Sequence, residues 1–255
     1  MSVADTLSIQ LYSLRNDGDL DHALDTVAGL GFRRVETVGG HLADAKATRK
    51  ALDARGLTAP TGHVGLADLR ERFDWVVDQA GIVGIEHIFM PAVPQEERDA
   101  SADQWKAVGA ELGAMAERMG KAGLKLGYHN HHWELKSYAD GTRPLEHLFE
   151  AAKGSPLTWE ADIAWLARGD VDPVEWLERY KPLLRAAHVK DIAPAGEKED
   201  EDGWADVGEG VLDWPKLWRE AASRGAVHMV LEHDKPKDGV RFARVSRAYL
   251  LETVA

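Results

Sequence analysis

The chain has 255 residues, of which 44% are hydrophobic, so it is long enough and apolar enough to bury a substantial core and is not expected to be disordered. No cysteine is present, which excludes disulfides and leaves His, Asp and Glu as the ligands available to a metal site. The formal net charge of −12 favours solubility and opposes binding to the phosphate backbone of nucleic acids.

Short apolar segments alternate with longer stretches of helical periodicity along the chain. Eight short segments rich in β-branched residues are predicted to be strands: 7–11, 33–38, 57–64, 86–90, 124–131, 157–163, 183–189 and 227–232. Helices are predicted between and after them, over 19–30, 42–55, 69–80, 102–122, 145–152, 173–180 and 240–253. A further helix is predicted to begin at Asp213, which would cap it, with Pro215 in its first turn.

Eight successive strand–helix units indicate a parallel sheet built from β–α–β crossovers. Eight strands close into a (β/α)8, or TIM, barrel of roughly 250 residues, so we predict a single α/β TIM-barrel domain over residues 1–255. An open, doubly wound sheet is the alternative, but no Gly-rich dinucleotide turn follows the first strand. The long connection 192–212 is predicted to be either a lid over the site or a surface loop.

The sequence also predicts the setting of the protein. No apolar run approaches the roughly 20 residues that span a bilayer, and the first residues do not resemble a signal peptide. We therefore expect a soluble, cytoplasmic protein with neither a membrane nor a nucleic acid as its partner. A homo-oligomer would be compatible with such a barrel.

Chemistry-bearing side chains gather at the predicted strand ends, where the active sites of (β/α)8 barrels lie. They are Glu36, His63, His129, Asn130, His131, His132, Glu160, Asp162, His188, Lys190, Glu232 and Asp234. Residues two apart on a strand share a face, so His129 points with His131 and Glu160 with Asp162. The last four strands all end in ligand-type residues, which predicts a divalent-metal site. Histidine and carboxylate ligands suit Mn²⁺, Zn²⁺, Co²⁺ or Fe²⁺, and suit Mg²⁺ less well.

Electrostatics supports the same prediction, because Asp162 and Glu232 would repel each other unless a cation lay between them. Aromatic residues are less informative. Trp133, Trp159 and Trp204 could line a pocket or pack in the core, whereas Trp165 follows Asp162 by three residues toward the site.

Seven motifs at these positions resemble the sugar phosphate isomerase/epimerase family, the xylose isomerase-like TIM barrels. They are SIQLYSLR (8–15), GFRRVE (31–36), LGYHNHHWEL (126–135), EADIAW (160–165), HVKD (188–191), VGEGVLDW (207–214) and VLEHD (230–234). The resemblance covers nearly the whole chain and implies one divalent ion, Mn²⁺ first, held by Glu, Asp, His and Glu on strands five to eight. By position this implies Asp162, His188 and Glu232 as ligands. His129 stands where many members have Glu, as in the subgroup with a Tyr-His-Asn-His fifth strand, and is either a fourth ligand or a base.

The resemblance implies an isomerase or epimerase that removes a proton next to a carbonyl of a sugar or keto-sugar, through a metal-stabilised enediolate. Glu232 would act on one side of the substrate and His129, His131 or Glu160 on the other, while Lys190 would stabilise the enediolate charge. Glu36, His63, Trp165 and Asp234 are expected to bind the carbohydrate substrate. No phosphate-binding signature is evident after strands seven and eight, which favours an unphosphorylated sugar.

Three other functions remain open at this stage. A lyase would use the same proton abstraction for β-elimination or dehydration of a 3-keto sugar or glycoside. A phosphodiesterase of the endonuclease IV type shares the barrel but needs a basic DNA-binding face, which the acidic charge disfavours. A non-catalytic carbohydrate-binding subunit would have kept the barrel and lost turnover.

Overall fold

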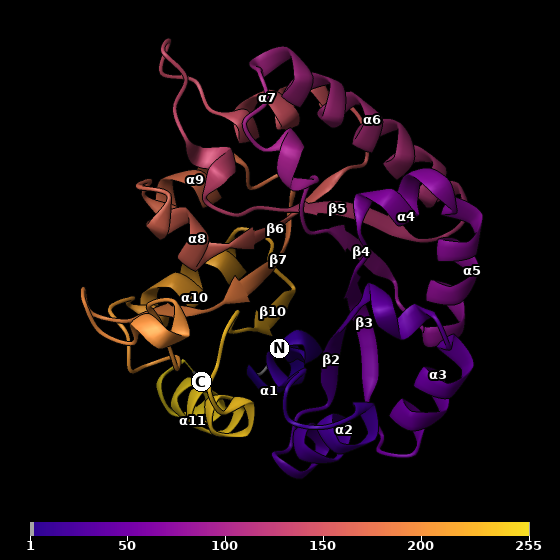
Figure 1. The fold of residues 1–255 in the computed structure, drawn as a ribbon, viewed down its shortest axis with the longest axis vertical. Coiled ribbons are helices and arrows are strands. Elements are labelled where there is room, and N and C mark those ends of the chain that lie inside the picture. Colours follow the sequence, from indigo (N-terminus) through magenta and orange to yellow (C-terminus); the bar gives the residue numbers. More distant parts are fainter. Residues whose placement is uncertain (1–2, 255) are drawn as a thin grey trace.

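Eight parallel strands close into a barrel at the centre of the computed structural model, which describes residues 3–254 (Figure 1). Around the barrel the strands follow chain order, and the last one, β10, pairs with both β7 and β1. The barrel strands are β1 (Leu7–Gln10), β2 (Arg34–Val38), β3 (Thr58–His63), β4 (His87–Met90), β5 (Lys125–His129), β6 (Thr158–Asp162), β7 (Leu184–Val189) and β10 (His228–Leu231). The (β/α)8 prediction and all eight predicted strands are therefore confirmed.

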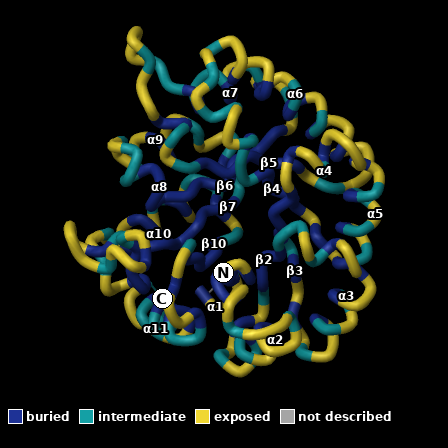
Figure 2. Tube along the Cα trace, viewed as in Figure 1, coloured by how far each residue is buried: buried dark blue, intermediate teal, exposed yellow. Residues whose placement is uncertain are grey.

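Helices enclose the barrel, and the faces that they turn outward are exposed while the strands are buried (Figures 1 and 2). The α-helices are α1 (Val3–Thr6), α2 (Leu20–Gly29), α3 (Ala45–Asp53), α4 (Leu66–Glu71), α5 (Phe73–Val83), α6 (Ala102–Lys121), α7 (Pro144–Ala151), α8 (Ile163–Arg168), α9 (Pro173–Arg179), α10 (Trp214–Ser223) and α11 (Gly239–Thr253). Short 3-10 helices are η1 (Leu11–Leu14), η2 (Gly39–Leu42), η3 (Gln95–Glu97), η4 (Trp133–Leu135) and η5 (Glu199–Glu201). The predicted cap is present, since the Asp213 side chain accepts from the backbone N–H of Lys216.

The structure differs from the predicted elements at two places. The helix predicted over 69–80 is two helices, α4 and α5, which meet at Arg72, where the backbone leaves the helical region (φ −142°, ψ 43°). The strand predicted over 157–163 ends at Asp162, because the Asp162 carboxylate accepts the backbone N–H of Trp165 and begins α8. A short helix therefore follows directly from a strand end that carries a predicted metal ligand.

The strand register brings the polar strand ends to neighbouring levels of the barrel. Gln10 pairs with Glu36 between β1 and β2, and His129 pairs with Glu160 between β5 and β6. Asp162 is likewise the partner of His188 between β6 and β7. Side chains from strands far apart in the sequence consequently share one end of the barrel.

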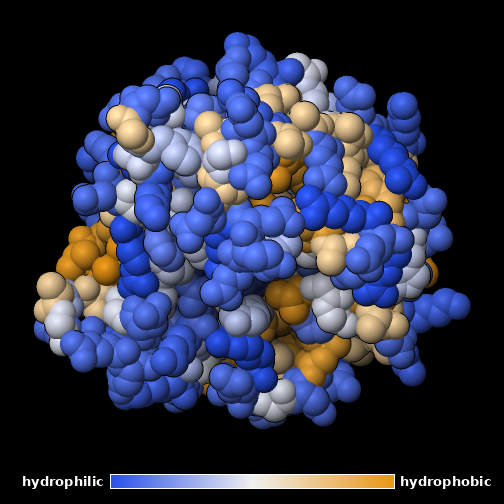
Figure 3. All heavy atoms as spheres, turned by 45° about the horizontal axis from the view of Figure 1, so that its top comes forward, coloured by the Kyte–Doolittle hydropathy of each residue, from blue (hydrophilic) through white to orange (hydrophobic). Residues whose placement is uncertain are grey.

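The core consists of apolar side chains between the strands and the inner faces of the helices. Trp159 and Trp204 are fully buried, so of the two predicted roles for these tryptophans the structure supports packing. On the face shown in Figure 3, hydrophilic residues dominate and hydrophobic ones form small, separate areas. Within residues 3–254, no helix combines the length and the apolar character that crossing a membrane would require.

Candidate functional site

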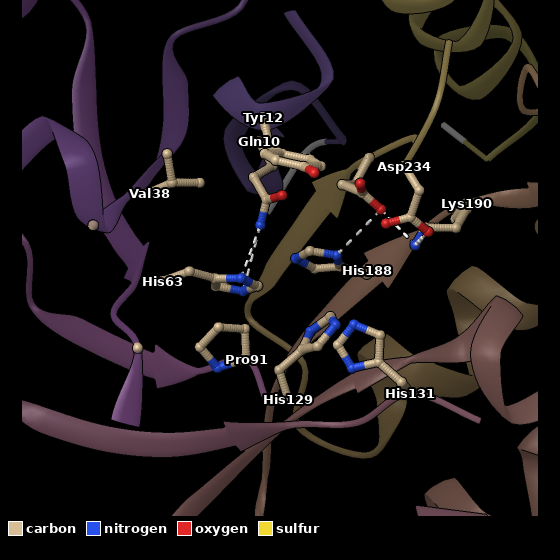
Figure 4. Close-up of a pocket in the computed structure, with 13 residues that line it drawn as sticks. Gln10, Tyr12, Val38, His63, Pro91, His129, His131, His188, Lys190 and Asp234 are labelled. Atoms are coloured by element: carbon tan, nitrogen blue, oxygen red, sulfur yellow. Dashed lines mark hydrogen bonds and ion pairs between the residues drawn. The ribbon is translucent and has the colours of Figure 1, made fainter. Parts of the chain in front are cut away.

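A cavity of about 360 Å³ opens at the carboxyl ends of the barrel strands (Figure 4). Its size is at the lower end of the roughly 300–1,000 Å³ typical of small-molecule sites, so it suits a ligand the size of one or two sugar rings. The lining residues are Gln10, Tyr12, Val38, Gly39, His63, Gly65, Pro91, His129, His131, His188, Lys190, Glu232 and Asp234. Most of them were among the strand-end residues that the sequence singled out.

Three buried side chains from successive barrel strands direct ligand atoms at one point. Atoms of Asp162, His188 and Glu232 all lie within 4.8 Å of one another. His188 Nδ1 is 3.9 Å from Asp162 Oδ2 and 3.9 Å from Glu232 Oε2. His129 approaches Asp162 from β5, with its Nε2 3.9 Å from Asp162 Oδ2. Three successive strand ends thus converge on one point, and the strand before them contributes a histidine next to it.

These atoms fit a divalent cation because their ordinary hydrogen bonds are missing. Within residues 3–254, no hydrogen-bond partner is found for Asp162 Oδ2, His188 Nδ1 or either oxygen of Glu232, although all are buried. The opposite atoms are engaged: Asp162 Oδ1 accepts from Trp165 N at 2.9 Å, and His188 Nε2 lies 2.9 Å from Glu36 Oε1. Since buried polar atoms are rarely left unpaired, a set of lone pairs aimed at one point is suited to a metal ion.

Lys190 is the positive charge of this region. Its ammonium lies 2.6 Å from Glu232 Oε2, 2.7 Å from Asp234 Oδ2 and 3.0 Å from Asp162 Oδ2. Only the contact with Asp234 has hydrogen-bond geometry, so the other two are ion pairs. Burial opposes the charge, but the three carboxylates outweigh it and raise the pKa of Lys190, so the side chain stays protonated.

A second layer of polar side chains lies beneath the cavity. Glu160 Oε2 is 2.6 Å from His63 Nε2, 3.0 Å from His129 Nδ1 and 3.3 Å from His188 Nε2. Glu36 Oε1 accepts from Gln10 Nε2 at 2.9 Å and also contacts His188. Both carboxylates are fully buried. They therefore contact the histidines of the site and are shielded from solvent.

The ionisation of the two layers is set by burial and by neighbouring charge. Burial and the adjacent charge of Glu36 raise the pKa of Glu160 to about 7. Burial also lowers the pKa of His129 and of His131 well below the usual value, with help from His188 and Lys190 respectively, so both imidazoles are neutral. For His188 burial acts in the same direction, but the carboxylates of Glu160 and Glu36 outweigh it and raise its pKa. The surroundings of His188 therefore favour positive charge, which a divalent cation next to its Nδ1 would supply in place of a second proton on the ring.

Along residues 128–131, side chains that face the cavity alternate with side chains that face away from it. His129 and His131 face the cavity, whereas Tyr128 and Asn130 point the other way and are fully buried. The Asn130 side chain accepts from Trp159 Nε1 at 2.9 Å and from Asp162 N at 3.1 Å, which joins the end of β5 to the end of β6. Buried Glu134 accepts from Tyr128 and from the backbone of His131, and so turns the chain after the strand.

The long connection 192–212 is folded around Asp191. The Asp191 carboxylate accepts from the backbone of Ile192, Gly208 and Leu212 at 2.9, 3.0 and 3.1 Å. A Cβ on Gly210 would lie 2.2 Å from Asp191 Oδ1, so only glycine fits there. Two short antiparallel strands, β8 (Asp191–Ile192) and β9 (Trp204–Ala205), close the segment. Of the two predictions for this connection, the structure matches the surface loop, because much of the segment is exposed, none of it lines the cavity, and Asp191 anchors it.

The predicted site residues fall into two groups. Seven line the cavity: His63, His129, His131, His188, Lys190, Glu232 and Asp234. The other four do not line it: Asp162 is fully buried next to His188 and Lys190, Glu36 and Glu160 lie beneath the cavity, and Trp165 is buried beside it, stacked on His132 with ring centroids 4.8 Å apart. Sequence reasoning did not select Gln10 and Tyr12, which line the cavity from the end of β1 and from η1. The SIQLYSLR motif was the available signal.

Comparison with known proteins gives the same fold. A family model described as xylose isomerase-like TIM barrel matches residues 24–249. A sugar phosphate isomerase/epimerase from Parabacteroides distasonis is similar with a TM-score of 0.80 and 22% identity, covering 97% of this chain and 94% of that one. The probable 3-DHS dehydratase AsbF from Bacillus anthracis has a TM-score of 0.78 and 13% identity, covering 96% and 98%.

A structure of the IolI protein with a bound zinc atom is also similar, with a TM-score of 0.78 and 11% identity over 98% of each chain. No protein with a curated description matches the sequence significantly. At these identities the structural similarity establishes the fold, and the activity has to be argued from the site.

Proposed function

The chain belongs to the xylose isomerase-like TIM-barrel family, and we propose that it is a divalent-metal-dependent isomerase or epimerase of a sugar or keto-sugar. The observation that carries the proposal is the convergence of buried ligand atoms of Asp162, His188 and Glu232, which have no hydrogen-bond partner among the described residues. The cavity next to them is of a size for a small carbohydrate.

His129, Asp162, His188 and Glu232 would hold the ion, with Mn²⁺ first and Zn²⁺, Co²⁺, Fe²⁺ and Mg²⁺ as alternatives. Such an ion, when bound, supplies Lewis-acid polarisation of a carbonyl and its neighbouring hydroxyl. His129 is assigned as a ligand because its Nδ1 is occupied by Glu160 and its Nε2 faces Asp162. This assignment removes His129 from the candidate bases.

Glu232 and His131 are the proposed proton-transfer groups. Both line the cavity, and His131 has a buried Nδ1 for which residues 3–254 provide no hydrogen-bond partner. Its lowered pKa keeps the imidazole neutral and able to accept a proton from a carbon next to a carbonyl. Lys190 would hold the oxygen on which negative charge develops. Glu160, predicted from the sequence as a third proton-transfer group, does not line the cavity, and we assign it a positioning role.

His63 and Asp234, together with Gln10 and Tyr12, are proposed to bind substrate hydroxyls, since all four line the cavity. Among the described lining residues Lys190 is the one lysine or arginine, and three carboxylates already surround it. A phosphate group would therefore find no unpaired lysine or arginine there, which supports an unphosphorylated sugar. Glu36 and Trp165, predicted from the sequence to bind substrate, lie outside the cavity wall, so we do not retain them in that role.

A lyase that eliminates from a 3-keto sugar remains the second candidate. The neutral imidazole of His131 beside Lys190 suits it equally, because proton abstraction next to a carbonyl is the first step of both reactions. The two reactions diverge only after the proton has been lost. An experiment that detects the loss itself and also the product distinguishes them.

The test is solvent exchange in D₂O, monitored by proton NMR on neutral ketoses and 3-keto glycosides. We expect deuterium to enter next to the carbonyl, activity to disappear with EDTA and return with Mn²⁺, and His188→Ala to be inactive. A product that has lost water or an aglycone would indicate the lyase. The exposed-surface variant His22→Ala is the matched control, and the phosphate ester of an active sugar should react poorly. Full activity in EDTA-treated His188→Ala would contradict the proposal.

A further inference from the structure

We infer that Glu36 and Glu160 are positioning residues that hold the two histidine ligands in the tautomers required for metal binding. Each buried carboxylate accepts the N–H of one imidazole, which leaves the other ring nitrogen with its lone pair directed at the ion. The inference rests on the metal site of the proposed function and assigns a role to the layer beneath it.

For His129 the arrangement is a line of three groups across the barrel. Glu160 Oε2 lies 3.0 Å from Nδ1 of the imidazole, and Nε2 on the opposite side faces Asp162 Oδ2 at 3.9 Å. An ionised carboxylate can only accept, and a bound cation nearby would favour the ionised form of Glu160, so the contact then places the proton on Nδ1. The lone pair of His129 is then on Nε2, the nitrogen that faces the proposed ion.

His188 has the reverse orientation. Its Nε2 lies 2.9 Å from Glu36 Oε1 and 3.3 Å from Glu160 Oε2, so this nitrogen carries the proton. Its Nδ1 faces Asp162 and Glu232, each at 3.9 Å. The two ligand histidines thus use different ring nitrogens, and the position of each carboxylate determines which one. Carboxylate acceptors of this kind orient metal-bound histidines and increase their basicity.

Gln10 and His63 complete the layer and fix its direction. Gln10 Nε2 donates to Glu36 Oε1 at 2.9 Å and lies 3.1 Å from His63 Nδ1. Gln10 donates its second amide hydrogen to His63 Nδ1. His63 then carries its own proton on Nε2, which lies 2.6 Å from Glu160 Oε2. The N–H groups of Gln10 and of the three histidines are then directed at Glu36, Glu160 or His63 Nδ1. None of them is directed at His129 Nε2 or His188 Nδ1, the two nitrogens proposed to bind the ion.

The competing interpretation is a second metal ion among His63, His129, Glu160 and His188, whose ligand-type atoms also lie within 4.8 Å of one another. Neighbouring ligands bound at about 2.1 Å are about 3.4 Å apart in a tetrahedron and about 3.0 Å apart in an octahedron. The 2.6 Å separation between Glu160 Oε2 and His63 Nε2 is shorter than either and matches a hydrogen bond. The distances therefore favour hydrogen bonding over a second ion.

The experiment measures metal affinity and stoichiometry in Glu36→Gln and Glu160→Gln. Competition with a chromophoric chelator should show Mn²⁺ and Zn²⁺ bound about 10–100-fold more weakly than by the wild type, with circular dichroism unchanged. Glu150→Gln, on the exposed face of α7, is the matched control and should bind as the wild type does. Elemental analysis should find one ion per wild-type chain.

A spectroscopic measurement keeps the test independent of how the variants fold. Nitrogen-15 NMR of the zinc-loaded wild type should show His129 protonated on Nδ1 and His188 on Nε2. The opposite tautomers, or variants that bind as tightly as the wild type, would overturn the inference and leave the proposed function standing. Two ions per chain would overturn it in favour of the second site. A wild type that binds no ion would overturn both the inference and the metal-dependent function.

Discussion

Asn130 provides a quantitative test of how the site is supported. Its side chain is fully buried behind the cavity, and its Oδ1 accepts from Trp159 Nε1 at 2.9 Å and from Asp162 N at 3.1 Å. In Asn130→Ala both donors would remain buried without an acceptor. Each unsatisfied buried donor costs about 1–3 kcal/mol, so for two donors we expect the free energy of unfolding to fall by about 2–6 kcal/mol.

Urea denaturation monitored by tryptophan fluorescence measures this change, and EDTA should be present so that metal binding does not contribute to stability. The control is Lys136→Ala, which removes an exposed side chain and an ion pair with Asp99 at 3.4 Å. We expect this control to lie within about 0.5 kcal/mol of the wild type. The reasoning is refuted if Asn130→Ala loses less than about 1 kcal/mol, because Trp159 and Asp162 would then have other partners.

Lys190, His87 and Gly210 provide three further tests. Lys190→Met should abolish turnover yet bind Mn²⁺ at least about tenfold more tightly in chelator competition, because a positive charge 2.6 Å from Glu232 is removed; weaker binding would contradict this. Burial is the main reason that the pKa of His87 falls to about 3, so the folded state resists a proton that the unfolded chain takes up below pH 6.5. This contribution to stability is lost at up to about 1.4 kcal/mol per pH unit as the pH falls from 6.5 toward 3. The difference in unfolding free energy between His87→Gln and the wild type should therefore narrow between about pH 7 and pH 5, and a constant difference would disprove it. Gly210→Ala should expose 192–212 to limited proteolysis, because its Cβ would lie 2.2 Å from Asp191 Oδ1; resistance equal to that of Gly40→Ala, in an open position, would count against this.

The fold was predictable because its signals are local. Eight short apolar segments each precede a stretch of helical periodicity. This alternation predicts β–α–β units with parallel strands, independently of how the side chains pack. The break at Arg72 was not predictable from periodicity, since 69–80 reads as one apolar helical pattern. Helix α8 was missed for a related reason. Ile163 continues the apolar run of the strand, and only the cap made by Asp162 shows where the strand ends.

For the candidate site, the sequence by itself determined the inventory of side chains and the face of the strand on which each one lies. Alternation along the strands placed His129 with His131, and Glu160 with Asp162, because neighbouring side chains point to opposite faces. Alternation could not determine how deep in the barrel each side chain lies. Residues two apart on one face are separated by about 6.7 Å along the strand, so Glu160 lies one layer below Asp162.

Only the tertiary structure decided which of these side chains form the cavity and which support it. The pairing of Gln10 with Glu36 and of His129 with Glu160 puts both glutamates beneath the histidines, out of reach of the cavity. It also places Lys190, which the sequence selected without its partners, among three carboxylates from two other strand ends. These relations join residues up to 152 positions apart, and they depend on barrel closure and strand register, which no local pattern in the sequence encodes.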